Sequence, residues 1–318
     1  MTYSLEVDAG WQESVVSVRD LRTWVSTLID LFMWEVIQSS RVDRQLLDQW
    51  HLGGSVSAEE VVLACAEESK RLVRLVQFNG VSQTQIRSSS MAWDTGGIHS
   101  LLCYARDTDA TFRLAQDLGW SALHDPVDME FGGRVMRNVV LRGPDGVNFA
   151  LYQQTTPPLE HKPSFSRASM PFNGQQMVKN VRTSVDFYSS TLGWNAWFDG
   201  TIRLNCNNFG MPSNFVGKIP KKVAILHARP EQHGQIELVE WVGFDGDDFS
   251  ARSLPPNLGI MSLRMPVSDL KTSVDKISQQ GGTLFSNPAQ VTIMPYGTVQ
   301  HCSILTPDGA LLELLQPS

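Results

Sequence analysis

The 318-residue sequence is poor in several features that define special classes of protein. It has four cysteines and no Cys-x-x-Cys pair, so we expect free thiols in a reducing compartment, without disulfides or a structural zinc site. No apolar run approaches the ~20 residues that cross a bilayer. The first residues lack the basic start and apolar run of an export signal. We therefore expect a cytoplasmic protein with no membrane partner.

An excess of positive charge is also missing. Lys and Arg number 26 against 33 Asp and Glu, which gives a net charge of −7 and argues against nucleic acid as a partner. The remaining composition, 42% hydrophobic and 19% charged, is typical of a soluble globular protein with room for about two domains. We expect a small-molecule ligand and a monomer or homodimer.

The sequence contains an internal repeat. Residues 14–34 and 176–194 share a short apolar strand, a polar break and a helix-spaced apolar segment that ends in Trp, at an offset of 160. Residues 100–120 and 262–282 form a second such pair. The spacing predicts a strand followed by a helix in each of the four segments.

The ends of the repeated units match as well. GPDGVNFALYQ (143–153) and TPDGALLELLQ (306–316) both read as a Pro-Asp-Gly turn followed by an apolar strand, 163 residues apart. RLVRLVQF (71–78) and QIELVEWV (235–242) are the matching last strands of the other two units. The pattern predicts an α+β protein of four βαβββ modules, in which modules 1 and 2 are duplicated as modules 3 and 4.

A proline-rich segment separates the two copies. QQTTPPLEHKPSFSR (153–167) has no apolar period and reads as an extended linker. We predict an N-terminal domain over 1–158, a linker over 159–167 and a C-terminal domain over 168–318. Each domain would pair its two modules into a cup-shaped half-barrel.

This architecture resembles the vicinal oxygen chelate superfamily, which includes glyoxalase I, bleomycin-resistance proteins and extradiol dioxygenases. The best-matching stretches are VRTSVDFYSSTLGW (181–194) and TPDGALLEL (306–314). The four-module, two-domain layout is similar to that of the extradiol dioxygenases. The superfamily is functionally broad, so the resemblance implies a fold more than an activity.

In that family His or Gln side chains of first strands and Glu side chains of last strands hold a divalent metal. Carried over by position, the first-strand residues here are Glu13, Ser100, Asn173 and Ser262, and the last-strand residues are Arg74, Ala150, Glu237 and Glu313. None of them is a histidine. The resemblance therefore implies a degenerate first domain and no resident cofactor. Gln175 and Gln176 lie close to the aligned position, so a divalent metal stays an alternative if one of these two glutamines takes the ligand position.

The two carboxylates of the second domain, Glu237 and Glu313, are the main catalytic candidates. Glu313 is the one polar residue of ALLELL, a strand expected to be covered on both faces. Two like charges in one cup would raise one pKa and leave the other carboxylate ionised. Such a pair can move a proton next to a carbonyl, which predicts a lyase or isomerase that needs no metal.

Other side chains of the second domain are expected around the same cup. His227 and His301 lie in strands that approach it and are further catalytic candidates, although a single strand histidine is more often structural. The substrate-binding candidates are Asn173, Gln176, Trp197, Phe198, Phe209, Ser262 and Tyr296. The aromatic ones among them would suit a flat ligand.

Three functions are left open. The first is an enzyme that acts on an aromatic or carbonyl-bearing metabolite by carboxylate acid/base chemistry. The second is a binding protein that sequesters a metabolite or drug without turnover. The third is a metal-dependent extradiol-type dioxygenase.

Overall fold

Four βαβββ modules form the chain, as the repeats predict. The computed structural model describes residues 3–65, 68–89, 91–122, 124–158, 164–203, 219–230 and 234–318. The helices are α1 (Leu21–Phe32), α2 (Arg44–Gln49), α3 (Thr108–Asp117), α4 (Val181–Leu192) and α5 (Leu270–Gln279). Within the described residues, none of these helices is long and apolar enough to cross a membrane.

The polar break of each module is a helix N-cap. Asp20, Asp107, Asn180 and Asp269 each accept a hydrogen bond from the backbone N–H three residues further on, at the start of α1, α3, α4 and α5. An Asp or Asn at this position satisfies one of the donors that the first helical turn leaves without a partner. This repeated requirement explains the repeated sequence signal.

The strands form two sheets of nine. Sheet I consists of β1 (Glu13–Ser17), β2 (Glu35–Arg41), β3 (Ser57–Cys65), β4 (Glu68–Asn79), β14 (Gly259–Pro266), β15 (Thr283–Leu284), β16 (Ala289–Ile293), β17 (Gly297–Leu305) and β18 (Leu311–Pro317). Sheet II consists of β5 (Ser100–Tyr104), β6 (Ser121–Ala122), β7 (Val127–Phe131), β8 (Arg134–Arg142), β9 (Asn148–Thr156), β10 (Asn173–Met177), β11 (Asn195–Arg203), β12 (Pro220–His227) and β13 (Gln235–Trp241).

The pairing of modules differs from the predicted one. Module 1 shares sheet I with module 4, because β1 pairs antiparallel with β14. Modules 2 and 3 share sheet II, where β5 pairs antiparallel with β10. The predicted boundary between domains 1–158 and 168–318 therefore does not separate two sheets, and residues 159–163 of the predicted linker lie outside the described part of the chain. The repeat identifies each module, but it does not say which modules share an edge.

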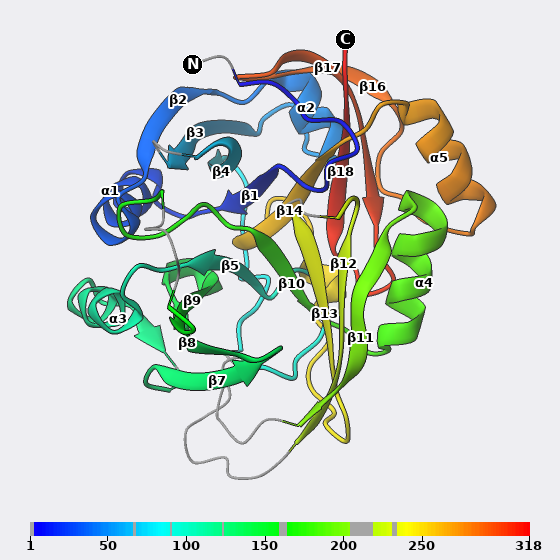
Figure 1. Ribbon diagram of the computed structural model, residues 1–318. Helices are drawn as coiled ribbons and strands as arrows, with labels where there is room; N and C mark the ends of the chain where they lie inside the picture. The colour runs from blue at the N-terminus through cyan, green and yellow to red at the C-terminus, as the bar shows by residue number, and fades with distance from the viewer. Residues whose placement is uncertain are drawn as a thin grey trace.

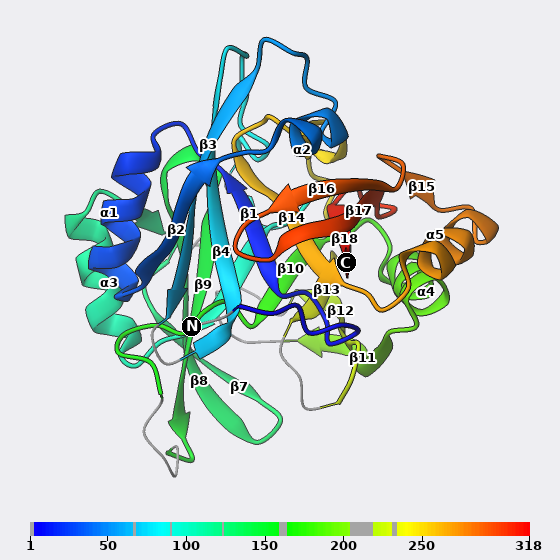
Figure 2. The ribbon, with the colours of Figure 1, turned by 90° about the horizontal axis from the view of Figure 1, so that it is seen from above.

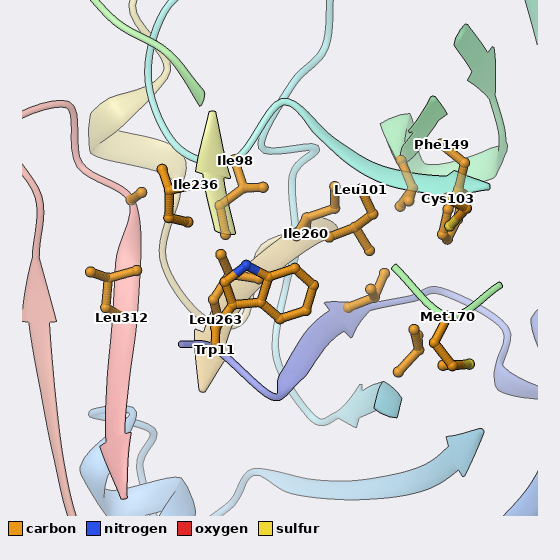
Figure 3. Close-up of a cluster of buried hydrophobic side chains, with 14 of the residues drawn as sticks. Trp11, Ile98, Leu101, Cys103, Phe149, Met170, Ile236, Ile260, Leu263 and Leu312 are labelled. Carbon is orange, nitrogen blue, oxygen red and sulfur yellow. The ribbon is translucent and has the colours of Figure 1, made fainter. Parts of the chain in front are cut away.

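The two sheets lie one above the other, with helix pairs on either side (Figure 1). Helix α1 packs beside α3, and α4 beside α5, so the helices pair within each half of the chain while the sheets pair across the halves. One apolar core fills the space between the sheets. It combines Leu263 and Leu312 of sheet I with Leu101 and Ile236 of sheet II (Figure 3).

Close approach of the sheets depends on Gly174 of β10. A Cβ at this position would lie 2.8 Å from Leu263 Cδ1 of sheet I, which is shorter than an ordinary contact. Since the side chains of a strand alternate between its faces, the neighbours of Gly174, Asn173 and Gln175, point to the other face of sheet II. The strand thus presents polar residues away from the core.

Helix α2 covers the concave face of sheet I. It lies in the connection between β2 and β3 and contacts β16 of module 4 (Figure 2). Leu46, Leu47 and Trp50 are buried there in an apolar cluster with Val15 and Val299 of the sheet. The chain therefore fills this concave face with its own side chains.

Candidate functional site

The concave face of sheet I contains a buried network of charged side chains. Arg74 of β4 donates from Nε to Glu13 Oε1 of β1 at 2.7 Å, and Arg264 Nη1 of β14 lies 2.6 Å from the same oxygen. Arg74 Nη1 lies 2.8 Å from Glu60 Oε2 of β3. Tyr296 donates to Glu13 Oε2 at 3.0 Å. Two guanidinium groups thus surround the carboxylate of Glu13.

Glu313 of β18 belongs to the same network. Its Oε2 lies 3.2 Å from Arg264 Nε and 3.0 Å from His301 Nε2, and Ser262 donates to its other oxygen. Burial by itself would raise the pKa of Glu313, but the charge of Arg264 and the hydrogen bond from His301 outweigh burial and lower the pKa to about 2. This carboxylate is an ion-paired anion and not a proton acceptor.

Residues at the C-terminal end of α2 close the network from the concave side. Gln49 Oε1 lies 3.4 Å from His301 Nδ1, and the Arg264 guanidinium lies 6.0 Å from the centroid of the Trp50 ring. Burial would raise the pKa of Glu13, but Arg74 and Arg264 lower it overall. The charged side chains on sheet I are therefore paired with one another and are covered by the chain itself, which indicates a structural role.

Sheet II has a different set of polar side chains. Ser100 of β5 donates to Gln175 Oε1 of β10 at 3.0 Å, and Gln175 Nε2 donates to Glu237 Oε1 of β13 at 2.8 Å. The strand register places the three residues in one row across the sheet. Because Ser100 fixes the orientation of the Gln175 amide, its N–H points at the Glu237 carboxyl group.

Glu237 has an ionisable group suited to proton transfer near neutral pH. Burial raises its pKa to about 7, although the hydrogen bond from Gln175 and the charge of Lys221 act in the opposite direction. Glu313 has two close cationic or hydrogen-bonding neighbours on its Oε2, whereas Glu237 Oε1 accepts its hydrogen bond from the neutral amide of Gln175. The two glutamates occupy equivalent positions but differ in charge state.

The surroundings of Glu237 are mainly apolar. Leu102, Met177, Ile225 and Val239 form a buried apolar cluster on the concave face of sheet II. Glu237 is opposite Ile225 and two residues before Val239, so it lies on the same face. The outermost strands β7 and β11 meet across this face, where the Phe131 and Phe198 rings lie 5.1 Å apart in an edge-on contact. A low-polarity enclosure of this kind is what raises the pKa of a carboxyl group.

Several polar atoms on this face have no hydrogen-bond partner among the described residues. They are Asn138 Oδ1, Asn173 Oδ1 and Trp241 Nε1, and all three side chains are buried. In β8, β10 and β13 these residues alternate with neighbours whose side chains face the core between the sheets. They therefore lie on the same face of the sheet as Glu237. Buried polar atoms without partners are rare in folded proteins and are often satisfied by a ligand or water.

A divalent metal does not fit either set of residues. In sheet I the guanidinium of Arg74 stands at one carried-over ligand position and Arg264 occupies the space between Glu13 and Glu313. In sheet II the four positions hold Ser100, Ala150, Asn173 and Glu237, of which Ala150 has no ligand atom. In the part of the chain that the structure describes, no group of three His, Cys, Asp or Glu side chains is placed to hold a metal.

Comparison with solved structures identifies the fold. Glyoxalase I from Zea mays superposes with a TM-score of 0.64 over 97% of this chain and 92% of that one, at 16% sequence identity. A protein from Bacillus subtilis, provisionally named a dioxygenase, superposes with a TM-score of 0.58 over 98% of this chain and 86% of that one, at 10% identity. No family model and no curated protein sequence matches the chain. The chain has the vicinal oxygen chelate fold.

Within this vicinal oxygen chelate fold, the predicted pairing of Glu237 with Glu313 is wrong. Glu237 lies in β13 of sheet II and Glu313 in β18 of sheet I, so each faces a different concave surface. Ser262, His301 and Tyr296 accompany Glu313 and belong to the sheet I network. The acid/base pair that we expected therefore does not exist, and of the two glutamates Glu237 remains as a candidate.

The structure also relocates two of the predicted binding residues and does not describe a third. Gln176 points to the helical side, where its Nε2 donates to the Tyr188 hydroxyl of α4 at 2.7 Å; its neighbour Gln175 faces the concave side instead. Trp197 alternates with the inward-facing Phe198 and is 49% exposed. Phe209 lies outside the described residues. Strand alternation makes a register error of one residue sufficient to move a side chain to the wrong face.

The other predicted residues of sheet II have mixed positions. Asn173 is buried on the concave face, two residues before Gln175. His227 is half-buried at the end of β12, opposite Asn195 of the edge strand β11. Phe198 packs against the apolar cluster around Glu237.

Sequence reasoning missed two buried cations. Arg264 in SLRMPV and Lys221 in PKKVAIL each interrupt an otherwise apolar strand, and such a residue in a strand covered on both faces signals a buried partner or a ligand. The same argument that singled out Glu313 in ALLELL could have found both.

Proposed function

We propose that the protein is an enzyme that transfers a proton to or from a carbon atom of a small organic molecule bound on the concave face of sheet II, with Glu237 as the acid/base group. The observation that carries the proposal is the pKa of about 7 of a buried carboxyl group whose oxygen accepts a hydrogen bond from an oriented amide. On this proposal the protein would act as a lyase or an isomerase.

The charge state of Glu237 supports this role. A group whose pKa lies near the working pH is populated in both protonation states and can therefore accept a proton and return it in one cycle. Gln175 holds one carboxyl oxygen at 2.8 Å and leaves the other available to a substrate. A carboxylate with the pKa of Glu313, about 2, would be too weak a base for the same task.

The lining of the face favours an apolar, unsaturated substrate. Tyr152, Trp241 and Phe198 belong to or pack against the apolar cluster that surrounds Glu237. Sites for small organic ligands are largely apolar with a few placed polar groups. The buried oxygens of Asn138 and Asn173 would bind hydrogen-bond donors of such a molecule.

Exchange of carbon-bound hydrogen in D2O tests the proposal. Phenylpyruvate, phenylacetone and mandelate would be incubated with the protein and followed by NMR, with buffer alone as the blank. We expect exchange of at least one compound by the wild type and a loss of roughly 100-fold or more in Glu237→Gln, which keeps the shape but not the acid/base group.

Glu240→Gln is the matched control. Glu240 is on the same strand but on its other face, where it lies 2.6 Å from Lys222 and accepts a hydrogen bond from the N–H of Val181. This variant should exchange at the wild-type rate. Unchanged exchange in Glu237→Gln would contradict the proposal. Tight binding by the wild type without any exchange would also contradict it and would favour sequestration of a metabolite.

A further inference from the structure

A cavity of about 490 Å³ lies at the end of β13, where the strand joins the segment that leads to β14. Its aromatic lining consists of Trp93, Trp241 and Phe244. The Phe244 ring lies between the two indoles, with its centroid 5.3 Å from that of Trp93 and 6.0 Å from that of Trp241. A cavity of this size is typical of small-molecule sites. Glu237 is not part of its lining.

Two of the three rings are accessible to a ligand. Trp93 and Phe244 are half-buried, whereas Trp241 is only 5% exposed. Lys221, which does not line the cavity, already lies over Trp241, with its Nζ 4.4 Å from the ring centroid. The face of an aromatic ring attracts a cation that lies within about 6 Å of the centroid. Trp93 and Phe244 are therefore the rings to which a further cation can bind.

The charged residues of the lining leave an excess of negative charge. Lys179 is paired with Asp248 at 2.6 Å. Glu240 is paired with Lys222 at 2.6 Å. Asp245 also lines the cavity, and it forms no ion pair with any residue that the structure describes. The lining thus favours a cation over an anion or a neutral molecule.

A buried carboxylate lies next to this lining. Asp94 is 3% exposed, and its Oδ1 accepts a hydrogen bond from the N–H of Asp247 at 2.9 Å. Its Oδ2 has no hydrogen-bond partner among the described residues. A Cβ at Gly246 of the lining would lie 2.5 Å from Asp94 Oδ1, so the carboxylate is close to the cavity. The charge of Arg87, which donates to the backbone oxygen of Asp94 at 2.6 Å, offsets part of this negative charge.

We propose that this cavity binds a small organic cation with a quaternary ammonium group, held by the rings of Trp93 and Phe244 and by the charge of Asp245. A quaternary ammonium group has no N–H donor, so it loses no hydrogen bonds to water when aromatic rings surround it. The inference goes beyond the proposed function, because it assigns a second ligand site that does not use Glu237.

Choline and 3,3-dimethylbutan-1-ol are matched probes, because the second has a carbon atom in place of the quaternary nitrogen and differs mainly in charge. Their binding would be measured by isothermal titration calorimetry at 0.15 M salt, which screens charges more than about 8 Å apart. We expect the wild type to bind choline roughly tenfold more tightly than the alcohol.

Replacement of an accessible ring should reduce this preference, which is the ratio of the two affinities and is insensitive to lost apolar contact. Trp93→Leu and Phe244→Leu should each lower it roughly threefold or more, whereas Trp93→Phe, which keeps an aromatic face, should retain most of it. Trp197→Leu is the matched control, because Trp197 is 49% exposed and does not line the cavity.

The charge of Asp245 is tested in the same assay. Asp245→Asn should lower the preference for choline severalfold, and Asp30→Asn, which makes the same change at an exposed position of α1, should not. The proposal is overturned if the wild type binds both probes equally, if the two folded leucine variants of the lining keep the full preference, or if either control lowers it to the same degree. Should neither leucine variant fold, an equal preference in Asp245→Asn and Asp30→Asn overturns the proposal.

A short peptide that carries trimethyllysine distinguishes a free small molecule from a methylated protein as the source of the cation. Peptide binding no tighter than that of choline supports a small-molecule site. Peptide binding roughly tenfold tighter than that of choline overturns this assignment, because residues on either side of the methylated lysine would then contribute to binding.

Discussion

At the scale of single residues, equivalent positions of the repeat have acquired opposite electrostatics. Glu313 is neutralised by Arg264 and His301, and its pKa falls to about 2; Glu237 faces an amide in an apolar setting, and its pKa rises to about 7. The sequence predicts both glutamates as buried strand residues, because each interrupts an apolar strand. It does not predict their charge states, since the partners Arg264 and Gln175 lie 49 and 62 residues away along the chain.

Ionisation of Glu237 should lower the free energy of unfolding of the protein above neutral pH. Its folded-state pKa of about 7 lies above the ordinary value of 4.5, so the folded protein binds more protons between these two values and stability falls as the pH rises through that window. At pH 8 Glu237→Gln should be more stable than the wild type by up to about 3 kcal/mol, at ~1.4 kcal/mol for each pH unit of the difference. Urea denaturation at pH 5 and pH 8 measures this.

The matched control for this effect is again Glu240→Gln, whose difference from the wild type should be similar at both pH values. If the stability difference between Glu237→Gln and the wild type does not grow from pH 5 to pH 8, the carboxyl group of Glu237 is not protonated in the folded protein at neutral pH. Glu237 would then be a poorer candidate for proton transfer.

At the scale of elements, the strand and helix order follows closely from the sequence, and the register does not. Caps such as Asp20 and Asp269 and the Pro-Asp-Gly turns mark where elements start and end. The choice between Gln175 and Gln176 depends on a single-residue register that local pattern leaves undetermined. Helix α2 was not expected in the polar segment after β2, because its stability comes from Leu46 and Trp50 packing on sheet I.

Arg264 holds three neighbouring strands of sheet I together. From β14 it contacts Glu13 of β1 at 2.6 Å and Glu313 of β18 at 3.2 Å. Arg264→Ala would remove the positive charge that pairs with both buried carboxylates, and loss of one partner of a buried ion pair typically costs about 3–5 kcal/mol of folding free energy. We expect a loss of this size in guanidinium denaturation. Arg203→Ala, at an exposed position of β11, should change stability by less than ~0.5 kcal/mol. Equal stability of the two variants would show that the network contributes little.

At the scale of the whole molecule, the halves of the chain are linked in two ways. Asp145 of the first Pro-Asp-Gly turn accepts from the backbone N–H of Arg19, and Asp308 of the second accepts in the same way from Lys179. These equivalent contacts join module 2 to module 1 and module 4 to module 3, while the sheets join module 1 to module 4 and module 2 to module 3. Duplication predicts the first link, because it is internal to the repeat. It does not predict the pairing of modules across the sheets, because the first strand of every module is equally able to pair with the first strand of another.

Neither half of the chain should therefore fold alone. In a fragment of residues 164–318, β14 would lose β1 and β10 would lose β5, and the core between the sheets would lose Leu101 and Trp11 from its centre. Separately expressed fragments 1–158 and 164–318 should be aggregated or unfolded, whereas co-expression should give a soluble one-to-one complex that shows the circular dichroism spectrum of the intact chain. A cooperative unfolding transition of fragment 164–318 as a monomer would contradict this, because the predicted second domain would then be an independent folding unit despite its shared sheets.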